Sequence, residues 1–255
     1  MPLDCLTIPC LSDNYAFLIV DPDSREAALV DVPEAAPIAA ALEDGGWRLT
    51  TVLLTHHHPD HVQGLGALAE GRALKVVGAE ADAHRLPPLT RQVADEDSFT
   101  LLGEEVRVMD VSGHTIGHVA FHIPGMGHAF TADSLMAMGC GRLFEGTPAQ
   151  MWESLRKLRA LPEDTVICSG HEYTLTNARF AAGLEPGNAE VISRLEEAER
   201  SAAAGRPTVP SPLSLERRTN PFLRADDPAL AGAVGLTDAS AVEVFAEIRR
   251  RRDTF

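Results

Sequence analysis

Short runs of apolar residues, with turn residues between them, are typical of β-strands in the first two thirds of the chain. Residues 15–21 and 27–32 predict two strands that the turn at 22–24 joins as a hairpin. Further strands are predicted at 51–54, 74–77, 105–111, 119–123, 129–133 and 165–169. Residues 3–8 alternate only weakly, and 79–98 show no clear pattern.

Helices are predicted between these strands, at 33–43, 59–70 and 148–161. The last of them has Thr147 at the N-cap and Pro148 at the first helical position, which are preferred residues there. The mixture of strands and helices predicts an α/β fold.

The pattern changes after about residue 172, where strand signals end and Ala, Glu, Arg and Leu dominate. Helices are predicted at 174–183, 188–204, 227–232 and 239–251, with a Pro-rich connector at 206–212. We therefore expect an α/β domain at 1–172 and an all-helical domain at 173–255. By pattern alone, the helical part is equally suited to packing on the first domain and to binding substrate.

The amino-acid composition argues against several classes of protein. The 255 residues include 37 acidic and 22 basic side chains, and a net charge of −15 argues against a nucleic-acid partner. There is no 18-residue apolar run and no basic-then-apolar leader, so we expect neither a membrane span nor a signal peptide. The four scattered cysteines predict reduced thiols rather than disulfides, and therefore a cytoplasmic protein.

The densest group of chemically active side chains is at residues 55–61, T-H-H-H-P-D-H, directly after the strand at 51–54. His56 and His58 are two apart, so they point to the same side of an extended backbone. Pro59 ends the extension, and Asp60 and His61 follow in the first turn of a helix. The loop thus offers ligands in two directions, an arrangement that suits a pair of metal ions better than one.

Three later strand ends each carry one more ligand-type residue. His114 and His171 each follow a strand and a glycine, and Asp133 ends the strand at 129–133. Any one alone is more often structural, but together with the first loop they make four strand-to-loop junctions that converge on one rim of a sheet. For the remaining histidines we expect other roles. His57 should point away from the ligands, His118 either orients a ligand or is structural, and His84, His122 and His128 are surface or half-buried residues.

These residue types favour hydrolysis by two metal ions. Imidazole and carboxylate suit zinc, iron or manganese, and the absence of paired cysteines argues against a purely structural thiolate site. An aspartate such as Asp133 can bridge two ions. The alternative, a histidine-rich surface loop, fits poorly with a position directly after a buried strand.

The residues also carry a family resemblance. Residues 55–61 are similar to the T-H-x-H-x-D-H motif of the metallo-β-lactamase superfamily. The chain further resembles glyoxalase II, the hydroxyacylglutathione hydrolases, nearly from end to end. Additional matches are at Asp133 and at residues 113–115, 139–147, 170–174, 185–188, 220–224 and 249–255, and those at 139–147, 170–174 and 249–255 are the most specific.

The resemblance implies an αββα sandwich followed by a small helical domain, and hydrolysis of S-D-lactoylglutathione to D-lactate and glutathione by a metal-bridging hydroxide. It implies one ion held by His56, His58 and His114, and a second held by Asp60, His61 and His171. Asp133 would bridge both ions, and Asp60 would also orient the hydroxide. Zinc is the first choice, with iron or manganese as alternatives.

The same resemblance implies that Arg142, Phe144, Tyr173, Arg249 and Arg252 bind the substrate. Arg142 and Arg252 stand where the family usually has lysine, and Phe144 stands where it commonly has tyrosine, which makes the thiol carrier itself an open question. A plain alternative for the terminal arginines is a solvated helix end.

We expect a monomer whose partner is a small glutathione thioester. The alternatives are a hydrolase of another thioester, a lactone or a β-lactam, and a non-catalytic binding protein.

Overall fold

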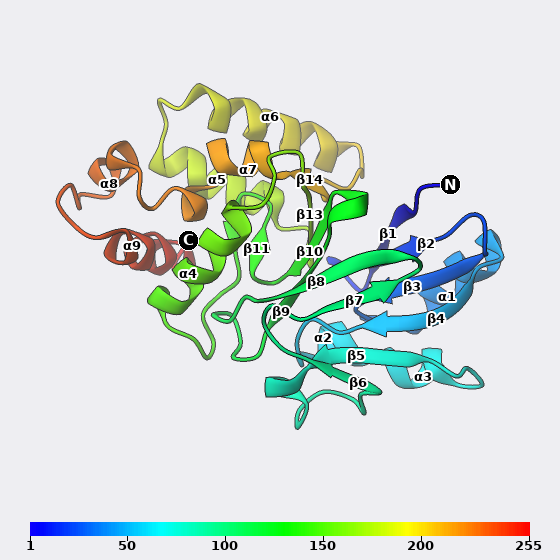
Figure 1. Cartoon of the computed structure of the whole chain (residues 1–255). Coiled ribbons are helices and arrows are strands. Elements are labelled where there is room, and N and C mark those ends of the chain that lie inside the picture. Colours follow the sequence, from blue (N-terminus) through cyan, green and yellow to red (C-terminus); the bar gives the residue numbers. More distant parts are fainter. The chain divides into compact units, whose positions relative to one another are not determined.

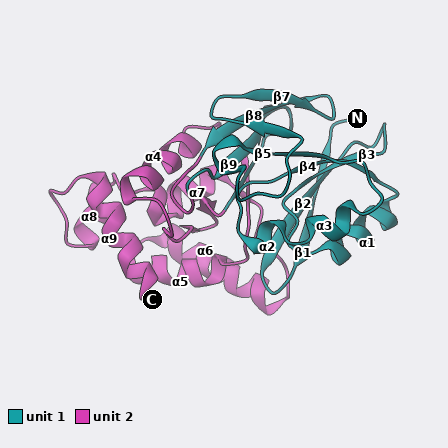
Figure 2. Cartoon of the chain, turned by 90° about the horizontal axis from the view of Figure 1, so that it is seen from below, with its two compact units in different colours: residues 1–110, 116–132 teal, residues 111–115, 133–255 magenta.

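A computed structural model gives the fold of residues 1–255, and Figure 1 traces its helices and strands along the chain. The chain divides into two compact units, coloured separately in Figure 2. The first unit contains Met1–Asp110 and Ile116–Ala132, and the second contains Val111–Thr115 and Asp133–Phe255. The change of composition near residue 172 falls inside the second unit, and the division into 1–172 and 173–255 stays a prediction.

A six-stranded sheet forms one layer of the first unit, and its strand order follows the sequence. The strands are β1 (Asp4–Cys10), β2 (Asn14–Val20), β3 (Glu26–Val30), β4 (Arg48–Leu53), β5 (Lys75–Ala79) and β6 (Arg91–Val93). β1, β2 and β3 are antiparallel neighbours, whereas β3, β4, β5 and β6 run parallel. Because β3 and β4 are parallel neighbours, the residues that follow them, Asp31 and Thr55, lie at the same edge of the sheet.

One face of this sheet is covered by helices. They are α1 (Ala35–Gly45), α2 (Pro59–Val62) and α3 (Leu65–Ala69), followed later by the short 3₁₀ segment η1 (Glu80–Asp82). Ile38 and Leu42 of α1 and Leu65 and Leu68 of α3 are buried in one cluster with Leu18, Leu29 and Val52 of the strands. Burying each such side chain stabilises the fold by roughly 1.5–3 kcal/mol, so these contacts fix the loops at the ends of β3 and β4.

A second set of strands in this unit pairs antiparallel, β7 with β8, β8 with β9 and β9 with β10. They are β7 (Ser98–Leu101), β8 (Glu104–Asp110), β9 (Val119–Ile123) and β10 (His128–Ala132), with the 3₁₀ segment η2 (Pro124–Met126) before β10. The Phe17 ring of β2 and the Phe130 ring of β10 have centroids 5.7 Å apart, so the two sets of strands share an apolar contact. Phe121 and Phe130 are fully buried.

The second unit is mainly helical. Its elements are β11 (Leu135–Met136), β12 (Gly139–Cys140), α4 (Pro148–Arg159), β13 (Val166–Ser169), α5 (Thr174–Leu184), α6 (Ala189–Ala203), β14 (Ser211–Pro212), α7 (Leu213–Thr219), η3 (Pro221–Leu223), α8 (Pro228–Ala233) and α9 (Ala241–Asp253). Phe222 of η3 lies between Phe180 of α5 and Phe245 of α9, at centroid distances of 6.3 and 5.8 Å. Trp152 of α4 packs against the same Phe245. These aromatic contacts join four elements far apart in sequence.

Three expectations from the sequence were wrong. The helix predicted at 59–70 is two short helices, because the Gly64 backbone N–H donates to the Val32 carbonyl at 2.9 Å and not to the carbonyl four residues before it. The strand at 165–169 is not the last, since β14 pairs with β13, and the helix α7 was not predicted. His122 is buried rather than half-buried, at 5% exposure.

Helix α4 offers a test of the fold. Thr147 accepts a hydrogen bond from the Gln150 backbone N–H, and the Gln150 side chain bonds back to the Thr147 N–H, which completes a capping box. Replacement Thr147→Ala is expected to lower the free energy of unfolding by about 1 kcal/mol, measured by urea denaturation. Thr176→Ala, at an exposed position inside α5, is the control and should be neutral or slightly stabilising. Equal effects of the two changes would contradict the capping role.

Candidate metal centre

The loop after β4 brings together its four candidate ligands within the first unit. The side-chain nitrogens His56 Nε2 and His58 Nδ1 face each other at 3.1 Å. Asp60 Oδ2 and His61 Nε2 are 3.8 Å apart. His56 and His61 are fully buried, and their rings lie 4.2 Å apart. Helix α2 starts at Pro59, as the sequence predicted, and turns Asp60 and His61 toward the end of β4.

A buried carboxylate, Asp31, fixes the orientation of this loop. One of its oxygens accepts hydrogen bonds from the Thr55 hydroxyl and from His61 Nδ1, each at 2.8 Å, and the other accepts from the Thr55 backbone N–H at 2.9 Å. The Thr55 hydroxyl in turn lies 3.1 Å from His56 Nδ1. Because Nδ1 of both imidazoles is engaged in this way, Nε2 is the nitrogen left to bind an ion.

No sequence pattern singles out Asp31 as a member of the site. It follows an apolar strand like many aspartates, and only its position beside Thr55 at the shared sheet edge reveals the contact. Its backbone φ of 58° lies in the left-handed region, which is uncommon for residues other than glycine. Asn14 is a second residue that contacts the site without a signal in the sequence. Its side-chain amide donates to Asp60 Oδ2 at 3.0 Å and to the Asp60 carbonyl at 3.1 Å.

The three remaining candidate ligands meet within the second unit. Asp133 Oδ2 lies 3.4 Å from His114 Nε2 and 3.3 Å from His171 Nε2, so one carboxylate oxygen stands between two imidazoles. His114 donates from Nδ1 to the Arg142 carbonyl at 2.8 Å. All three side chains are buried, at 3–5% exposure. This arrangement is what an aspartate that bridges two ions requires.

These distances fit metal ligands. Nitrogen or oxygen ligands about 2.0–2.1 Å from a tetrahedral zinc ion are about 3.3–3.4 Å from one another. The His56–His58 pair and the His114–Asp133–His171 group have spacings of 3.1–3.4 Å. The donor set of imidazole and carboxylate, with no thiolate, suits zinc, iron or manganese. The residues therefore fit divalent metal ions.

Of the other histidines, His57 belongs to the loop at 55–61 and His118 packs against it. His57 contacts the buried Asp82 carboxylate through Nδ1, at 2.8 Å. The His118 ring stacks on the His56 ring at 4.6 Å, with the planes 12° apart. His118 therefore supports the position of a candidate ligand, which agrees with one of its two sequence interpretations.

Aromatic and basic side chains surround the Asp133 group in the second unit. Tyr173 stacks on His171 at 4.7 Å, and the exposed ring of Phe144 meets His114 edge-on at 5.3 Å. Tyr173 and Phe144 were predicted from the sequence to bind substrate, and the structure sets each beside a candidate ligand.

Two of the three predicted arginines of the second unit pair with one carboxylate. Asp253 lies 3.3 Å from Arg142 Nε and 2.8 Å from Arg249 Nη2. Arg252 Nε donates to the Asn177 side-chain oxygen at 3.1 Å, and burial, followed by the charge of Arg249, lowers the pKa of the Arg252 guanidinium. Arg249 is itself buried and donates to the Cys140 carbonyl at 2.9 Å.

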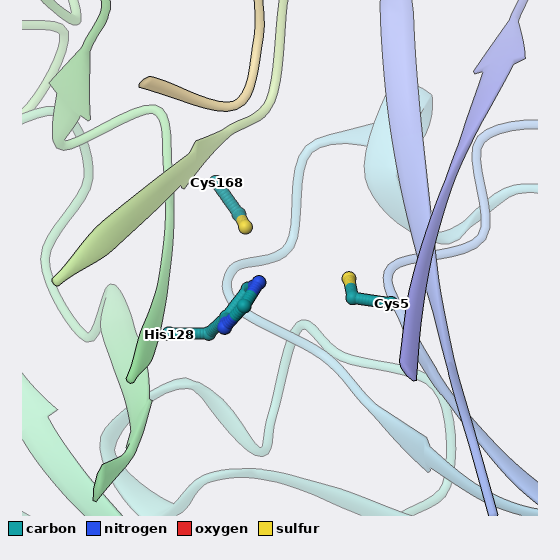
Figure 3. A group of neighbouring side chains, drawn as sticks. All are labelled: Cys5, His128 and Cys168. Carbon is teal, nitrogen blue, oxygen red and sulfur yellow. The ribbon is translucent and has the colours of Figure 1, made fainter. Parts of the chain in front are cut away.

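A smaller group of ligand-type side chains includes no residue of the loop at 55–61. Cys5 of β1 and His128 of β10 have ligand atoms within 4.8 Å of each other. Figure 3 draws them, together with Cys168 of β13. His128 Nδ1 donates to the Met126 carbonyl at 2.7 Å. Two ligands within the first unit are fewer than the three or four of a zinc site, so we assign no ion there.

Comparison with known proteins agrees with this geometry. Residues 12–171 match the family model described as the metallo-beta-lactamase superfamily, and residues 172–255 match that described as hydroxyacylglutathione hydrolase C-terminus. Proteins named hydroxyacylglutathione hydrolase from Cereibacter sphaeroides and Ruegeria pomeroyi are 61% and 60% identical to the chain, each over its full length and theirs. The chain belongs to the hydroxyacylglutathione hydrolase family. It is therefore a metal-dependent hydrolase of the α/β class, as the sequence predicted.

Solved structures agree on the fold. ETHE1 from Myxococcus xanthus aligns with a TM-score of 0.66 at 25% identity, covering 98% of this chain and 90% of its own. The BLEG-1 B3 metallo-beta-lactamase aligns with a TM-score of 0.62 at 23% identity, over 66% of this chain and 91% of its own. The metallo-β-lactamase fold expected from the sequence is confirmed. No helix of the structure combines the length and the apolar character that crossing a membrane requires.

Asp31 gives the first test of the site. Because its carboxylate orients His61 directly and His56 through Thr55, Asp31→Ala is expected to lower divalent-metal affinity by about 10–100-fold. Metal titration of the chelator-treated protein measures this change. Asp44→Ala, on the exposed end of α1, is the control and should leave the affinity unchanged. Unchanged affinity in Asp31→Ala would contradict the orienting role.

Cys140 gives a test that is independent of metal. Burial raises the pKa of its thiol to about 11, against the opposing charge of Arg249. A raised pKa keeps the thiol protonated at pH 8, so iodoacetamide should not alkylate Cys140 in the folded protein, whereas the partly exposed Cys5 should react. Peptide mass spectrometry after labelling at pH 8 and pH 10 checks this order. Reaction of Cys140 before Cys5 at pH 8 would contradict it.

Proposed function

We propose that this protein hydrolyses S-D-lactoylglutathione to D-lactate and glutathione, a step in the detoxification of methylglyoxal. Support comes from the full-length relatives named hydroxyacylglutathione hydrolase, at up to 61% identity. The observation that carries the choice of substrate is a cluster of three arginines: Arg142 and Arg249 pair with the single carboxylate of Asp253, and the charges of these three groups all act on the pKa of Arg252. This local excess of positive charge, in a protein of net charge −15, suits a substrate with two carboxylates.

For the metal centre, we propose two divalent ions, zinc first and iron or manganese as alternatives. His56, His58 and His114 would hold one ion, Asp60, His61 and His171 the other, and Asp133 both. Two observations support this division. His56 and His58 point their nitrogens at each other, and Asp133 shares one oxygen between His114 and His171. Two bound ions would supply an acidified water and polarise the thioester carbonyl.

The side chains of the protein hold the reacting groups in place. Asp31, Thr55 and the Arg142 carbonyl keep the imidazoles in one tautomer and one orientation. In the reaction the C–S bond breaks and a water oxygen replaces the sulfur. Because a thiol has a pKa of about 8.5, the glutathione leaves as a thiolate without a proton donor from the protein.

The second part of the proposal is that the thiol carrier of the substrate is glutathione. Arg142 is exposed and paired with Asp253 only across 3.3 Å, so its guanidinium is available to a substrate carboxylate. Tyr173 and Arg252, which belong to the predicted helical domain at 173–255, would add a hydroxyl and a second cation. Arg249 is also predicted to bind substrate, although its bonds to the Cys140 carbonyl and Asp253 favour a role in holding this group together. Phe144 offers no hydroxyl, so its contact would be apolar.

Arg142 tests this assignment. If it binds a carboxylate far from the scissile bond, Arg142→Ala should raise KM for S-lactoylglutathione about tenfold and leave kcat nearly unchanged. Arg156→Ala, at an exposed ion pair with Glu153 on α4, should change neither. Thiol release monitored with a chromogenic disulfide gives both constants. The proposed function fails if the metal-loaded protein hydrolyses lactones, β-lactams or other thioesters but releases no thiol from S-lactoylglutathione.

The cytoplasmic location and the monomeric state are proposed with the same function. Cell fractionation and size-exclusion chromatography with light scattering check them. Elemental analysis of protein purified without added metal identifies the ion.

A further inference from the structure

The short hairpin of β11 and β12 ends in a turn that side chains of the helices hold. Met136, Ala137 and Met138 are at most 4% exposed. Asn220 donates to the Met136 carbonyl at 3.0 Å and to the Gly139 carbonyl at 2.9 Å. Asn177 of α5 donates to the Ala137 carbonyl at 3.1 Å. Met138 has a φ of 59°, so this turn is held in a conformation that its own residues do not favour.

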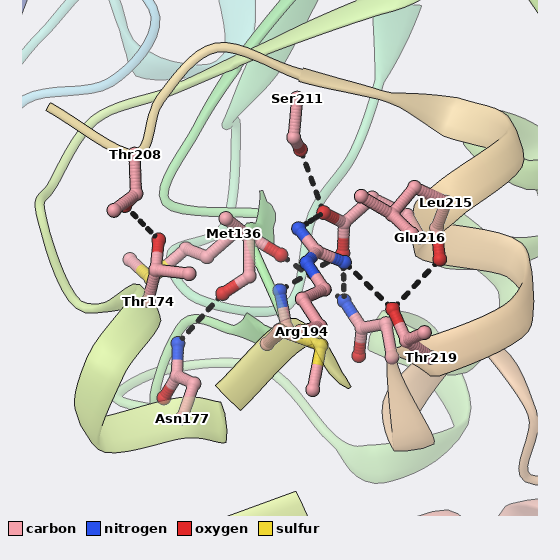
Figure 4. Close-up of polar contacts among 12 residues, drawn as sticks. Met136, Thr174, Asn177, Arg194, Thr208, Ser211, Leu215, Glu216 and Thr219 are labelled. Carbon is pink, nitrogen blue, oxygen red and sulfur yellow. Dashed lines mark hydrogen bonds and ion pairs between the residues drawn. The ribbon is translucent and has the colours of Figure 1, made fainter. Parts of the chain in front are cut away.

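Glu216 of α7 is the acceptor at the centre of these contacts. Its side chain is fully buried, and its Oε2 accepts the Met138 backbone N–H at 2.9 Å and the Asn220 amide at 3.1 Å. Its Oε1 accepts the Ser211 hydroxyl at 2.6 Å and pairs with the Arg194 guanidinium of α6 (Figure 4). Oε2 therefore faces the turn, and Oε1 faces the Arg194 guanidinium, whose positive charge balances the negative charge of the Glu216 carboxylate.

The open end of the same hairpin carries the site. Asp133 precedes β11, and Gly141 and Arg142 follow β12. A Cβ atom on Gly141 would lie 2.0 Å from the Asp133 carbonyl oxygen and 2.8 Å from His114 Nδ1, so the two strands close tightly there. The Arg142 carbonyl is the acceptor that fixes His114. A shift of the turn is thus transmitted to Asp133 and to the partner of His114.

We propose that Glu216 is a positioning residue for the reaction, because its hydrogen bond to Met138 sets the hairpin that carries Asp133 and Arg142. The hydrogen-bond partners of Glu216 are Met138, Asn220, Ser211 and Arg194, none of which is a candidate metal ligand. Arg194 serves only to balance its charge, since Arg194 bonds to Glu216 and to the Thr219 hydroxyl and not to the turn. The effect on turnover rests on the proposed function, whereas the effect on the hairpin does not.

The two oxygens of Glu216 allow positioning to be separated from stability. Arg194→Met combined with Glu216→Gln removes the buried charge from both sides but keeps a carbonyl oxygen for the Met138 N–H. Arg194→Met combined with Glu216→Leu also leaves no buried charge, and it removes that acceptor. The two double variants therefore carry the same charge and differ in whether residue 216 can hydrogen-bond to Met138, Asn220 and Ser211.

The first readout is kcat/KM for S-lactoylglutathione, measured well below the unfolding temperature of each variant. The glutamine double variant should stay within about threefold of the wild type, and the leucine double variant should lose about ten- to a hundredfold, since small displacements of reacting groups have effects of this size. Glu185→Gln is the control, because Glu185 forms a largely buried pair with Arg224 and bonds no atom of the turn. It should change kcat/KM by less than about twofold.

The second readout does not need turnover. Amide hydrogen exchange of the peptide that covers residues 133–142 should be faster in the leucine double variant than in the glutamine one, and bound metal per chain should fall in the same order. If the leucine variant does not fold, Asn220→Ser takes its place. A serine can still cap η3, as Asn220 does through the Phe222 N–H, but it is too short to reach the turn carbonyls.

The outcomes distinguish the two proposals. Equal exchange, metal content and kcat/KM in the two double variants, or in Asn220→Ser and the wild type, would overturn the role of Glu216. Faster exchange with unchanged metal content and kcat/KM would overturn it as well. A wild-type protein without thioesterase activity would refute the proposed function alone, and the exchange and metal measurements would still decide the role of Glu216.

Discussion

The chemistry of this protein depends on hydrogen bonds that hold imidazole rings in one tautomer. A buried acceptor at Nδ1 leaves Nε2 as the only nitrogen that can bind an ion. Asp31 does this for His61, Thr55 for His56, and the Arg142 carbonyl for His114. These acceptors lie on the backbone or on buried side chains, so the orientation of the rings is set by the fold and does not rely on the ions.

The two units hold the groups that orient the candidate ligands in different ways. In the first unit, β3 and β4 run parallel, which puts Asp31 beside Thr55 at one edge of the sheet. The helices that cover one face of this sheet hold the loops after β3 and β4 in place. In the second unit the support comes from side chains of the helices, with Glu216 and Asn220 bonded to the backbone of a buried turn. The helices of the second unit thus hold the segment that carries Asp133.

Much of this could be predicted from the sequence, and the failures have physical causes. The first loop is contiguous, so its proposed ligands His56, His58, Asp60 and His61 are visible as a motif, and His114, Asp133 and His171 are visible because each lies at the end of a strand or after it. Asp31 and Glu216 act through contacts between segments distant in the sequence, and a single buried acid has no local pattern. Gly64 likewise breaks a helix because of a neighbouring loop, which helical periodicity does not reveal.

The most direct test of this account is the tautomer of each imidazole, measured by two-dimensional ¹H–¹⁵N NMR of the zinc-loaded protein with labelled histidine. The account predicts a proton on Nδ1 of His56, His61 and His114. It predicts the opposite tautomer, with the proton on Nε2, for His58, whose Nδ1 faces His56 Nε2. A proton on Nε2 of His61 or His114, or the same tautomer in all four rings, would contradict the account.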